Sequence, residues 1–204
     1  MANNLKKFAS EAAYTSASLV RPAVSLIEAN NNVHFDPSAP WPALNGFDIA
    51  VEYEITDYTN EVKIYSGAYG EYQPIDVTEM EVDGVSVTPA NTYRFSSNGK
   101  HIVRYKLGNG EIYPKAFNTE QQINPYSYIV IGSGITKVGK GSLSNNTDRI
   151  KSYVFEGTTP PEEFSGATLG ATANVYVPAS AVNTFKTALQ GSDFENLVQA
   201  NPYE

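Results

Sequence analysis

The stretch that decides the fold runs from Ile129 to Gly139 and reads IVIGSGITKVG. It begins as an apolar run of strand length and is closed by glycine. Two shorter runs of the same kind follow, Tyr153–Gly157 and Val175–Pro178, at spacings of about 20 to 25 residues, which is typical of repeats that stack their strands. Stacked strands form a binding wall more often than a catalytic pocket, so the pattern favours a binding or structural protein.

The composition predicts a mainly β protein. The chain has 204 residues, 41% of them hydrophobic, with 14 tyrosines and nine phenylalanines against one tryptophan and two methionines. Aromatic and β-branched residues suit the half-buried surface of a sheet. The chain has no cysteine, which excludes disulfides, thiolate metal sites and a cysteine nucleophile. We expect no cofactor.

The charge is distributed unevenly. Residues 1–40 hold three acids and three bases, residues 41–113 eleven and five, and residues 114–204 eight and six, so the net charge of −8 divides into 0, −6 and −2. Nucleic-acid affinity rests on neutralising phosphates with lysine and arginine. The acidic middle therefore predicts no nucleic-acid partner.

The first residues and the length of the apolar runs bear on localisation. The first residues, MANNLKKFASE, carry two lysines but no apolar segment behind them, which differs from a secretory signal. No run of about 18 apolar residues occurs, so we expect no membrane span. The sequence predicts a protein made and kept inside the cell until it is assembled.

Residues 1–42 read as an N-terminal helix and hairpin arm with a linker. A short helix is expected up to Ala17, ended by Arg21-Pro22 because the residue before proline avoids the α region. Residues 23–28 and 33–35 flank an asparagine-rich turn and predict a hairpin. The proline-rich run Asp36–Pro42 predicts a stiff linker.

Residues 43–113 predict a small β-sandwich, which a resemblance described below identifies as immunoglobulin-like. Apolar and polar residues alternate from position 47 to 55 with the two-residue period of a strand. Further strands are expected at residues 61–65, 75–82, 92–96 and 101–107. Tight turns are indicated at Asp83-Gly84, Asn98-Gly99 and Asn109-Gly110. Several short antiparallel strands in about 70 residues favour a sandwich.

Residues 114–204 predict a short, β-rich repeat module with a C-terminal cap. After Pro178, the run from Ala179 to Leu189 places Val182, Phe185 and Leu189 at helical spacing. Such a helix would cover the last strand. About two repeats are visible, fewer than a free-standing array needs, so the sandwich or a partner chain is expected to cover the open end.

Three stretches resemble known families. The pattern MEVDGV…YRFSSNGKHIVRYKL, from Met80 to Leu107, resembles immunoglobulin-like modules of gut Bacteroidales and their phages. The stretches from Ile131 to Gly139 and from Thr158 to Lys186 resemble degenerate leucine-rich repeats of bacteroidal surface antigens. The N-terminal piece, including Lys6–Tyr14 and Val20–Glu28, is similar to the starts of virion structural proteins of crAss-like and other Bacteroides phages.

The motifs of common enzymes are incomplete. Gly134–Gly141 nearly matches a phosphate-binding loop, but Gly141 stands where a hydroxyl is needed. Glu79, Glu81 and Asp83 alternate along one strand and could share a face, which is the raw material of a cation site or a glycosidase pair; a solvated strand face is the simpler interpretation. His34 and His101, the two histidines, lie in different segments. We therefore predict no enzyme, no catalytic residue and no metal site.

Two sets of residues are candidates for binding. Burying exposed apolar side chains lets a small segment hold a large surface. On this ground the predicted particle-docking residues are Leu5, Phe8, Tyr14, Val20 and Trp41, although packing on the sandwich would explain them equally well. Aromatic side chains can also stack on sugar rings. The predicted glycan-facing residues are Tyr65, Tyr69 and Tyr72.

The resemblances imply a structural protein of the virion. A capsid auxiliary or decoration protein is the first interpretation, with the major capsid protein or another virion protein as partner and with room for an oligomer. One alternative is a head or tail fibre component that binds a host surface glycan. A bacterial surface adhesin module is the other, and it would need an export signal upstream.

Overall fold

The structure, a computed structural model, describes residues 39–66, 75–117, 126–143, 150–170 and 173–203, together with two strands nearer the N-terminus. The chain divides into an N-terminal unit, residues 1–40, and a body, residues 41–202. In the first unit, β1 (Val24–Ala29) and β2 (Asn32–Pro37) pair antiparallel, as the asparagine-rich turn predicted. The predicted helix up to Ala17 lies outside the described residues.

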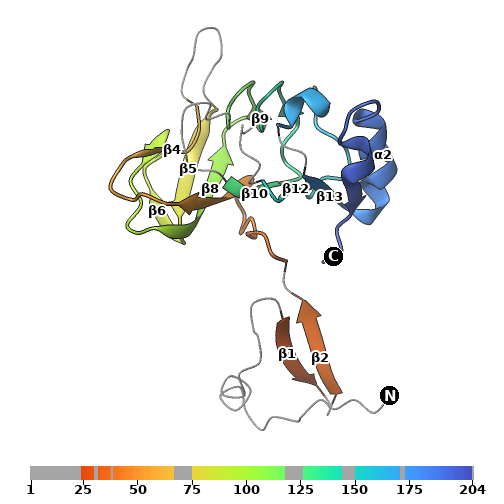
Figure 1. Ribbon diagram of the computed structural model, residues 1–204, viewed down its shortest axis with the longest axis horizontal. Coiled ribbons are helices and arrows are strands. Elements are labelled where there is room, and N and C mark those ends of the chain that lie inside the picture. The colour runs from red at the N-terminus through yellow and green to blue at the C-terminus, as the bar shows by residue number, and fades with distance from the viewer. Residues whose placement is uncertain are drawn as a thin grey trace. The chain divides into compact units, whose positions relative to one another are not determined.

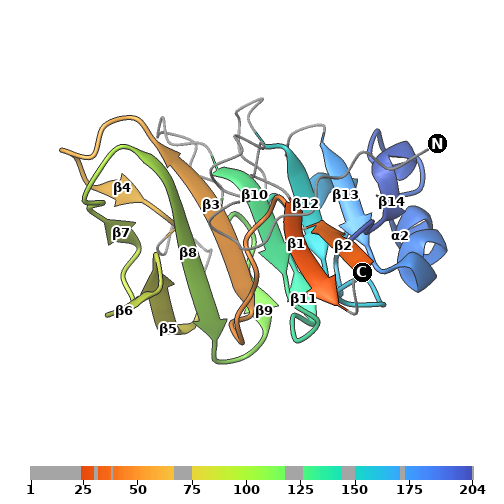
Figure 2. The ribbon, with the colours of Figure 1, turned by 90° about the horizontal axis from the view of Figure 1, so that it is seen from below.

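The body is built on one mixed sheet of eight strands, and the mainly β prediction is confirmed (Figures 1 and 2). The order across the sheet is β14-β13-β12-β10-β3-β8-β5-β6. The strands are β3 (Ile49–Ile55), β5 (Val77–Val82), β6 (Val85–Val87), β8 (Gly99–Leu107), β10 (Tyr126–Ile131), β12 (Ser152–Phe155), β13 (Asn174–Val177) and β14 (Val198–Ala200).

The sheet has an antiparallel half and a parallel half. Strands β6, β5, β8 and β3 pair antiparallel, and β10, β12, β13 and β14 pair parallel. The two halves meet where β3 pairs antiparallel with β10. The stretch predicted to form a sandwich and the stretch predicted to form a repeat therefore share one sheet.

Short elements cover the face of this sheet that packs into the core, which we call the inner face. Two small sheets pair β4 (Val62–Lys63) with β7 (Thr92–Tyr93) and β9 (Glu111–Ile112) with β11 (Lys137–Val138). The helices are the 3-10 turns Gly166–Thr168, Ala179–Ala181 and Glu195–Leu197 and the α-helix α2 (Val182–Ala188). As its spacing predicted, α2 buries Phe185, and the helix contacts β14.

Successive turns of chain stack on one another, and the first of them begins in β8. Backbone pairs join Ile112 to Val138 and Leu143 to Leu169, and Phe117 donates its N–H to the carbonyl of Ser142. The stretch LGNGEIYPKAF, which starts at the last residue of β8, therefore forms a turn equivalent to the stretch IGSGITKVGKGSL, which starts at the last residue of β10. The described residues show three turns stacked in this way, where the sequence indicated about two repeats.

One apolar core runs through both halves of the body. Its fully buried aromatic members come from β3, β8 and β12 alike, as Tyr53, Tyr105 and Phe155 illustrate. The hydroxyl of Tyr53 donates to the carbonyl of Ile64 and lies 3.1 Å from the hydroxyl of Tyr105. Burial raises the pKa of Tyr53 and of Tyr105, so both hydroxyls stay protonated inside the core.

Candidate functional site

A short segment crosses the outer face of the sheet, and it is the best-defined feature of that surface. This strap, residues 41–47, runs directly before β3 and is drawn in orange below β10 in Figure 1. Leu44 is buried against Ala50, Val130 and Val154, which lie on the outer face of β3, β10 and β12. The strap therefore covers apolar positions that would otherwise face water.

Two cationic side chains of β8 hold the backbone of the strap. Arg104 donates through Nε to the carbonyl of Ala43 at 2.7 Å, and Lys106 donates through Nζ to the carbonyl of Gly46 at 3.2 Å. Each also pairs with an acid, Arg104 with Glu81 and Lys106 with Asp48. Hydrogen bonds from charged donors are among the stronger ones, so the strap is fixed along its length.

Trp41, the one tryptophan of the chain, anchors the start of the strap. Its ring lies 4.9 Å from the ring of Tyr176 with 32° between the planes, and 6.4 Å from that of Tyr128. The ammonium of Lys151 lies 5.5 Å from the centre of the Tyr128 ring. Aromatic contacts at these separations are favourable beyond the area they bury. We call Trp41, Tyr128 and Tyr176 the aromatic anchor.

A glycine of the sequence motif makes room for the strap. Gly132 follows β10, and a Cβ atom built on it would lie 3.0 Å from both Cδ1 of Leu44 and the carbonyl oxygen of Asp48. The backbone of Gly132 also donates to that carbonyl at 2.8 Å. The glycine that closes the run Ile129–Ile131 thus permits a close approach of two chain segments.

The predicted docking residues fall in two places. Trp41 packs on the sheet of its own body, which is the alternative that explained these residues equally well, and its docking role stays a prediction. The ring serves the attachment of the strap because the outer face offers it two tyrosines. The other four, Leu5, Phe8, Tyr14 and Val20, lie outside the described residues.

The described part of the chain shows none of the predicted glycan-facing residues on its surface. Tyr65 is 7% exposed and meets Tyr105 edge to face at 5.8 Å, and burial raises its pKa. Its ring belongs to the core, so the prediction was wrong for Tyr65. The alternating pattern of the strand could not reveal that this ring packs inside the core. Tyr69 and Tyr72 lie outside the described residues.

Two of the three acids on the predicted acidic strand face, Glu81 and Asp83, have protein partners, and Glu79 is exposed. Glu81 pairs with Arg104, and Asp83 accepts from the backbone N–H of Ile102 at 2.8 Å while its other oxygen lies 2.6 Å from Nδ1 of His101. In the described part of the chain, no three histidine, aspartate or glutamate side chains gather as metal ligands would. These carboxylates stabilise the sheet.

His101 is a structural histidine. The side chain is buried, with Nδ1 facing Asp83 and Nε2 lying 2.9 Å from the carbonyl of Ser97, and Phe95 packs on the ring at 4.7 Å. Its hydrogen-bond partners are thus a carboxylate and a backbone carbonyl. A nucleophile activated by this imidazole would have to displace one of them. His34 lies in β2.

The near-match to a phosphate loop is a strand and a turn. Its backbone N–H groups donate to neighbouring turns, Thr136 to Gly110, Val138 to Glu162 and Gly141 to Ala167, at 2.8 to 3.0 Å. Phosphate loops leave such groups free for the ligand. Lys137, one of the two lysines of the motif, pairs with Glu163, and this hydrogen bond raises its pKa. The glycines therefore serve the stacking of the turns.

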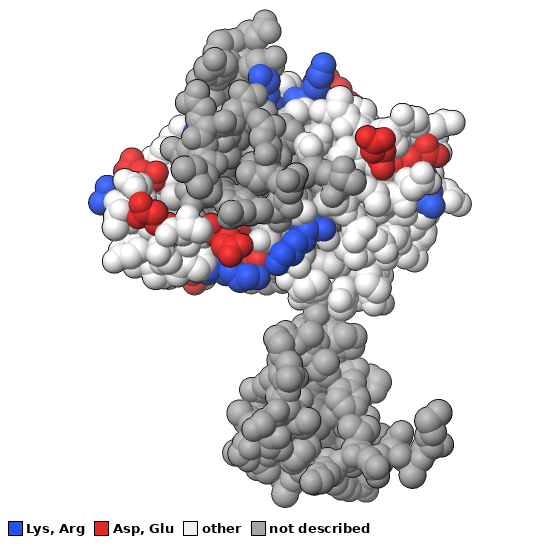
Figure 3. Space-filling view, viewed as in Figure 1, with Lys and Arg blue, Asp and Glu red and all other residues white. Residues whose placement is uncertain are grey.

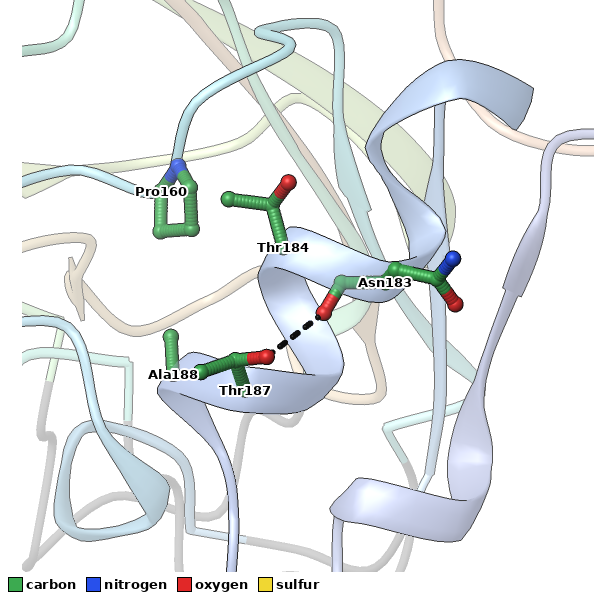
Figure 4. Close-up of a pocket in the computed structure, with 5 residues that line it drawn as sticks. All are labelled: Pro160, Asn183, Thr184, Thr187 and Ala188. Carbon is green, nitrogen blue, oxygen red and sulfur yellow. Dashed lines mark hydrogen bonds between the residues drawn. The ribbon is translucent and has the colours of Figure 1, made fainter.

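A shallow hollow beside α2 offers little chemistry. It has a volume of about 500 Å³ and is formed by one proline, two threonines, one asparagine and one alanine (Figure 4). The hydroxyl of Thr187 donates a hydrogen bond to the carbonyl of Asn183 at 3.0 Å. The lining residues contain no titratable side chain. The hollow lacks the groups of an active site.

The visible surface of the body mixes both charges. On the face drawn in Figure 3, acidic and basic side chains are interspersed. Mixed charge of this kind is typical of a solvated surface. No described helix has the length and apolar character needed to cross a bilayer.

Comparison with known proteins gives no relative. No model of a protein family matches the chain, and no curated protein or solved structure is similar enough to count as a match. The assignment of the two halves to immunoglobulin-like and leucine-rich-repeat modules therefore stays a prediction.

The strap was not recognised in the sequence. The run Asp36–Pro42 predicted a linker, and the boundary was set near residue 42, whereas the body already begins at Trp41. A signal was present: a large aromatic residue and Leu44 precede Asn45-Gly46, whose positive φ angles of 50° and 87° form a tight turn into β3.

We expect Trp41→Ala to loosen the strap while leaving the fold intact. The change removes both ring contacts of a half-buried tryptophan and should lower the free energy of unfolding by about 2 kcal/mol. Limited proteolysis should then reveal a new cleavage between residues 39 and 47, and denaturant unfolding followed by circular dichroism measures the stability. Trp41→Phe should keep most of both. Equal protease resistance of Trp41→Ala and the unchanged protein would contradict the anchor.

Proposed function

We propose that this chain is a non-enzymatic structural protein of a phage virion, acting as a capsid auxiliary or decoration protein. In this proposal the N-terminal unit docks on the major capsid protein or another virion protein, with Leu5, Phe8, Tyr14 and Val20 as docking residues, and the body is displayed outward. The resemblance to crAss-like Bacteroides phage proteins supports the virion as its location.

The observation that carries the proposal is the small apolar surface of the body. Among the described residues, the exposed large hydrophobic side chains are Tyr58, Val85 and Tyr203. Docking surfaces of soluble proteins usually carry a contiguous apolar patch. A body with so few exposed apolar side chains suits display, and the docking role is therefore assigned to residues 1–40.

The strap supports the same division of labour. A docking arm must transmit load to the part that it carries. The strap joins the root of the arm to the sheet through the aromatic anchor and through Arg104, which holds the carbonyl of Ala43. A pull on the arm would therefore be resisted first by the contacts between the strap and the sheet.

The non-enzymatic reading rests on the chemistry of the described side chains. Asp83 and His101, an acid and a base of the sheet, are hydrogen-bonded to each other. The hollow beside α2 holds none. Catalysis needs such groups convergent on a pocket.

Quantitative mass spectrometry of purified particles tests the proposal. We expect the chain at a ratio to the major capsid protein near one, or near a simple fraction set by capsid symmetry. A variant that lacks residues 1–40 should fold as the full chain does, because the body has its own core, yet be lost from particles. Absence of the full chain from particles, or full incorporation of the shortened one, would refute the docking role.

A head or tail fibre component that binds host glycan is the second candidate. The observation that favours it is the half-exposed Tyr176 beside Trp41 on the outer face, with half-exposed Asn174 on the same strand. An aromatic face next to an amide is a common way to hold a sugar ring. Only a few copies per particle, and an elongated trimer in solution, would favour this candidate over decoration. The adhesin alternative requires an export signal.

A further inference from the structure

The sheet of the body ends in a strand that lacks the usual protection of an edge. Strand β6 pairs with β5 on one side and is the last strand in the sheet order. Natural edge strands usually carry charges, above all lysine. From Gly84 to Tyr93 the sequence holds no charged residue, and Val85, on β6, is 64% exposed, the largest exposure among the exposed large hydrophobic residues of the described chain.

The backbone of β6 can accept another strand at Ser86. In antiparallel pairs, the N–H and C=O groups of successive residues point alternately to the two sides. Asp83 donates its N–H to the carbonyl of Ile102 on β8. By the alternation, the backbone N–H and C=O of Glu81 also point to β8, while those of Met80 and Val82 point to β6. Because Glu81 lies opposite Ser86, the N–H and C=O of Ser86 point to the open edge.

We propose that β6 pairs antiparallel with β6 of a second copy of this chain, with Ser86 on the two-fold axis. The two Ser86 residues would exchange a pair of backbone hydrogen bonds. Val85 would lie opposite Val87 of the partner subunit, and the reverse pair would form on the other side of the axis. A cross-strand pair of β-branched residues is favourable, so the exposed Val85 gains a partner.

The charge of the chain limits where a second copy can approach. The chain carries a net charge of −8, so two copies repel each other over most orientations. Pairing through β6 brings together two uncharged edges. The nearest acid on the outer face, Glu81, is already neutralised by Arg104. The β6 edge is thus a place where two copies approach with little like-charge penalty.

The contact is small and is expected to be weak in dilute solution. Strand β6 has three residues, which provides far less area than the roughly 1,200 Å² buried in stable interfaces. Such a contact becomes occupied where copies are held close together, since a shared support can raise the effective concentration to the mM range. Pairing at this edge does not depend on whether that support is a virion.

Cysteine cross-linking tests the pairing directly, because the chain has no cysteine of its own. In the full chain, Ser86→Cys places two thiols opposite each other across the axis, where the Cα spacing of about 5.5 Å suits a disulfide. The matched control is Asn196→Cys, an exposed position on the 3-10 turn Glu195–Leu197. At high protein concentration under mild oxidation, we expect Ser86→Cys to form dimer about tenfold faster.

A second substitution separates strand pairing from random collision. Val85→Lys in the Ser86→Cys background puts a charge opposite Val87 of the partner subunit and should remove the rate advantage. Val85→Thr should keep it. Both changes lie on an exposed side chain, so the fold should tolerate them. A rate for Ser86→Cys equal to that of Asn196→Cys, or one unaffected by Val85→Lys, would overturn the proposal.

Discussion

A fragment of residues 41–113, the predicted sandwich without the predicted repeat, is expected not to fold. In the body, β3 has a neighbour on each side, β8 and β10, and the fragment would lose β10 and leave a central strand as an open edge. The core would also lose Phe117, which packs edge to face on Tyr105 at 5.6 Å. We expect no sigmoidal denaturant transition and no near-ultraviolet dichroism from this fragment.

The matched control is residues 41–204, which keeps the whole sheet and removes the N-terminal unit. This fragment should unfold cooperatively with a midpoint close to that of the full chain, because one core spans the body. A fragment of residues 41–113 that unfolded cooperatively by itself would show that the two halves are separable domains.

The local features of this fold were readable from the sequence. Alternation from position 47 to 55 predicted β3, and Ile49, Val51, Tyr53 and Ile55 are indeed buried. Asp83-Gly84 predicted a tight turn, and the two residues have φ angles of 50° and 84°, as a two-residue hairpin between β5 and β6 requires. Period and turn chemistry are local, so they can be read without the tertiary structure.

The non-local features were not readable. The predicted boundary at residue 113 assumes that the sandwich ends before the repeat begins, yet the first stacked turn starts in β8 and β3 lies between β8 and β10. The alternation of β3 does not show which strands pair with it, whether one about 50 residues later in the sequence, as β8 is, or one about 80 residues later, as β10 is. Alternation put Ala50 and Glu52 on the face opposite Ile49 and Val51 but did not indicate that this face is covered, and the structure buries both, with Glu52 accepting from Lys100 at 2.9 Å.

The same limit applies to the candidate sites. Aromatic residues can serve a core, an internal anchor or a ligand, and the residue type alone does not decide between them. Tyr65 packs against Tyr105 in the core, and Trp41 packs against Tyr176 on the outer face. The acids at Glu81 and Asp83 were paired by β8, whose register with β5 is a property of the sheet.

Gly139→Ala is expected to destabilise the body by about 2 to 3 kcal/mol, because two stacked turns meet at this residue without space for a side chain. A Cβ atom there would lie 2.7 Å from Cδ and Cγ of Pro114 and 2.8 Å from its backbone nitrogen. The turns would have to separate, and the hydrogen bond from Gly139 to the carbonyl of Ile112, now 2.8 Å, would lengthen. The midpoint of denaturant unfolding measures the loss.

Gly157→Ala is the matched control for this prediction. Its Cβ would meet Ser133 and Thr159 at 3.6 Å, an ordinary contact distance, so we expect a change within about 0.5 kcal/mol. The comparison decides what stabilises the stack of turns. A large loss at Gly139 alone means that the turns depend on backbone contact, and the close approach would then explain why glycine stands at this position. Similar midpoints for both variants would mean that the stack yields to a methyl group and that side-chain packing holds it.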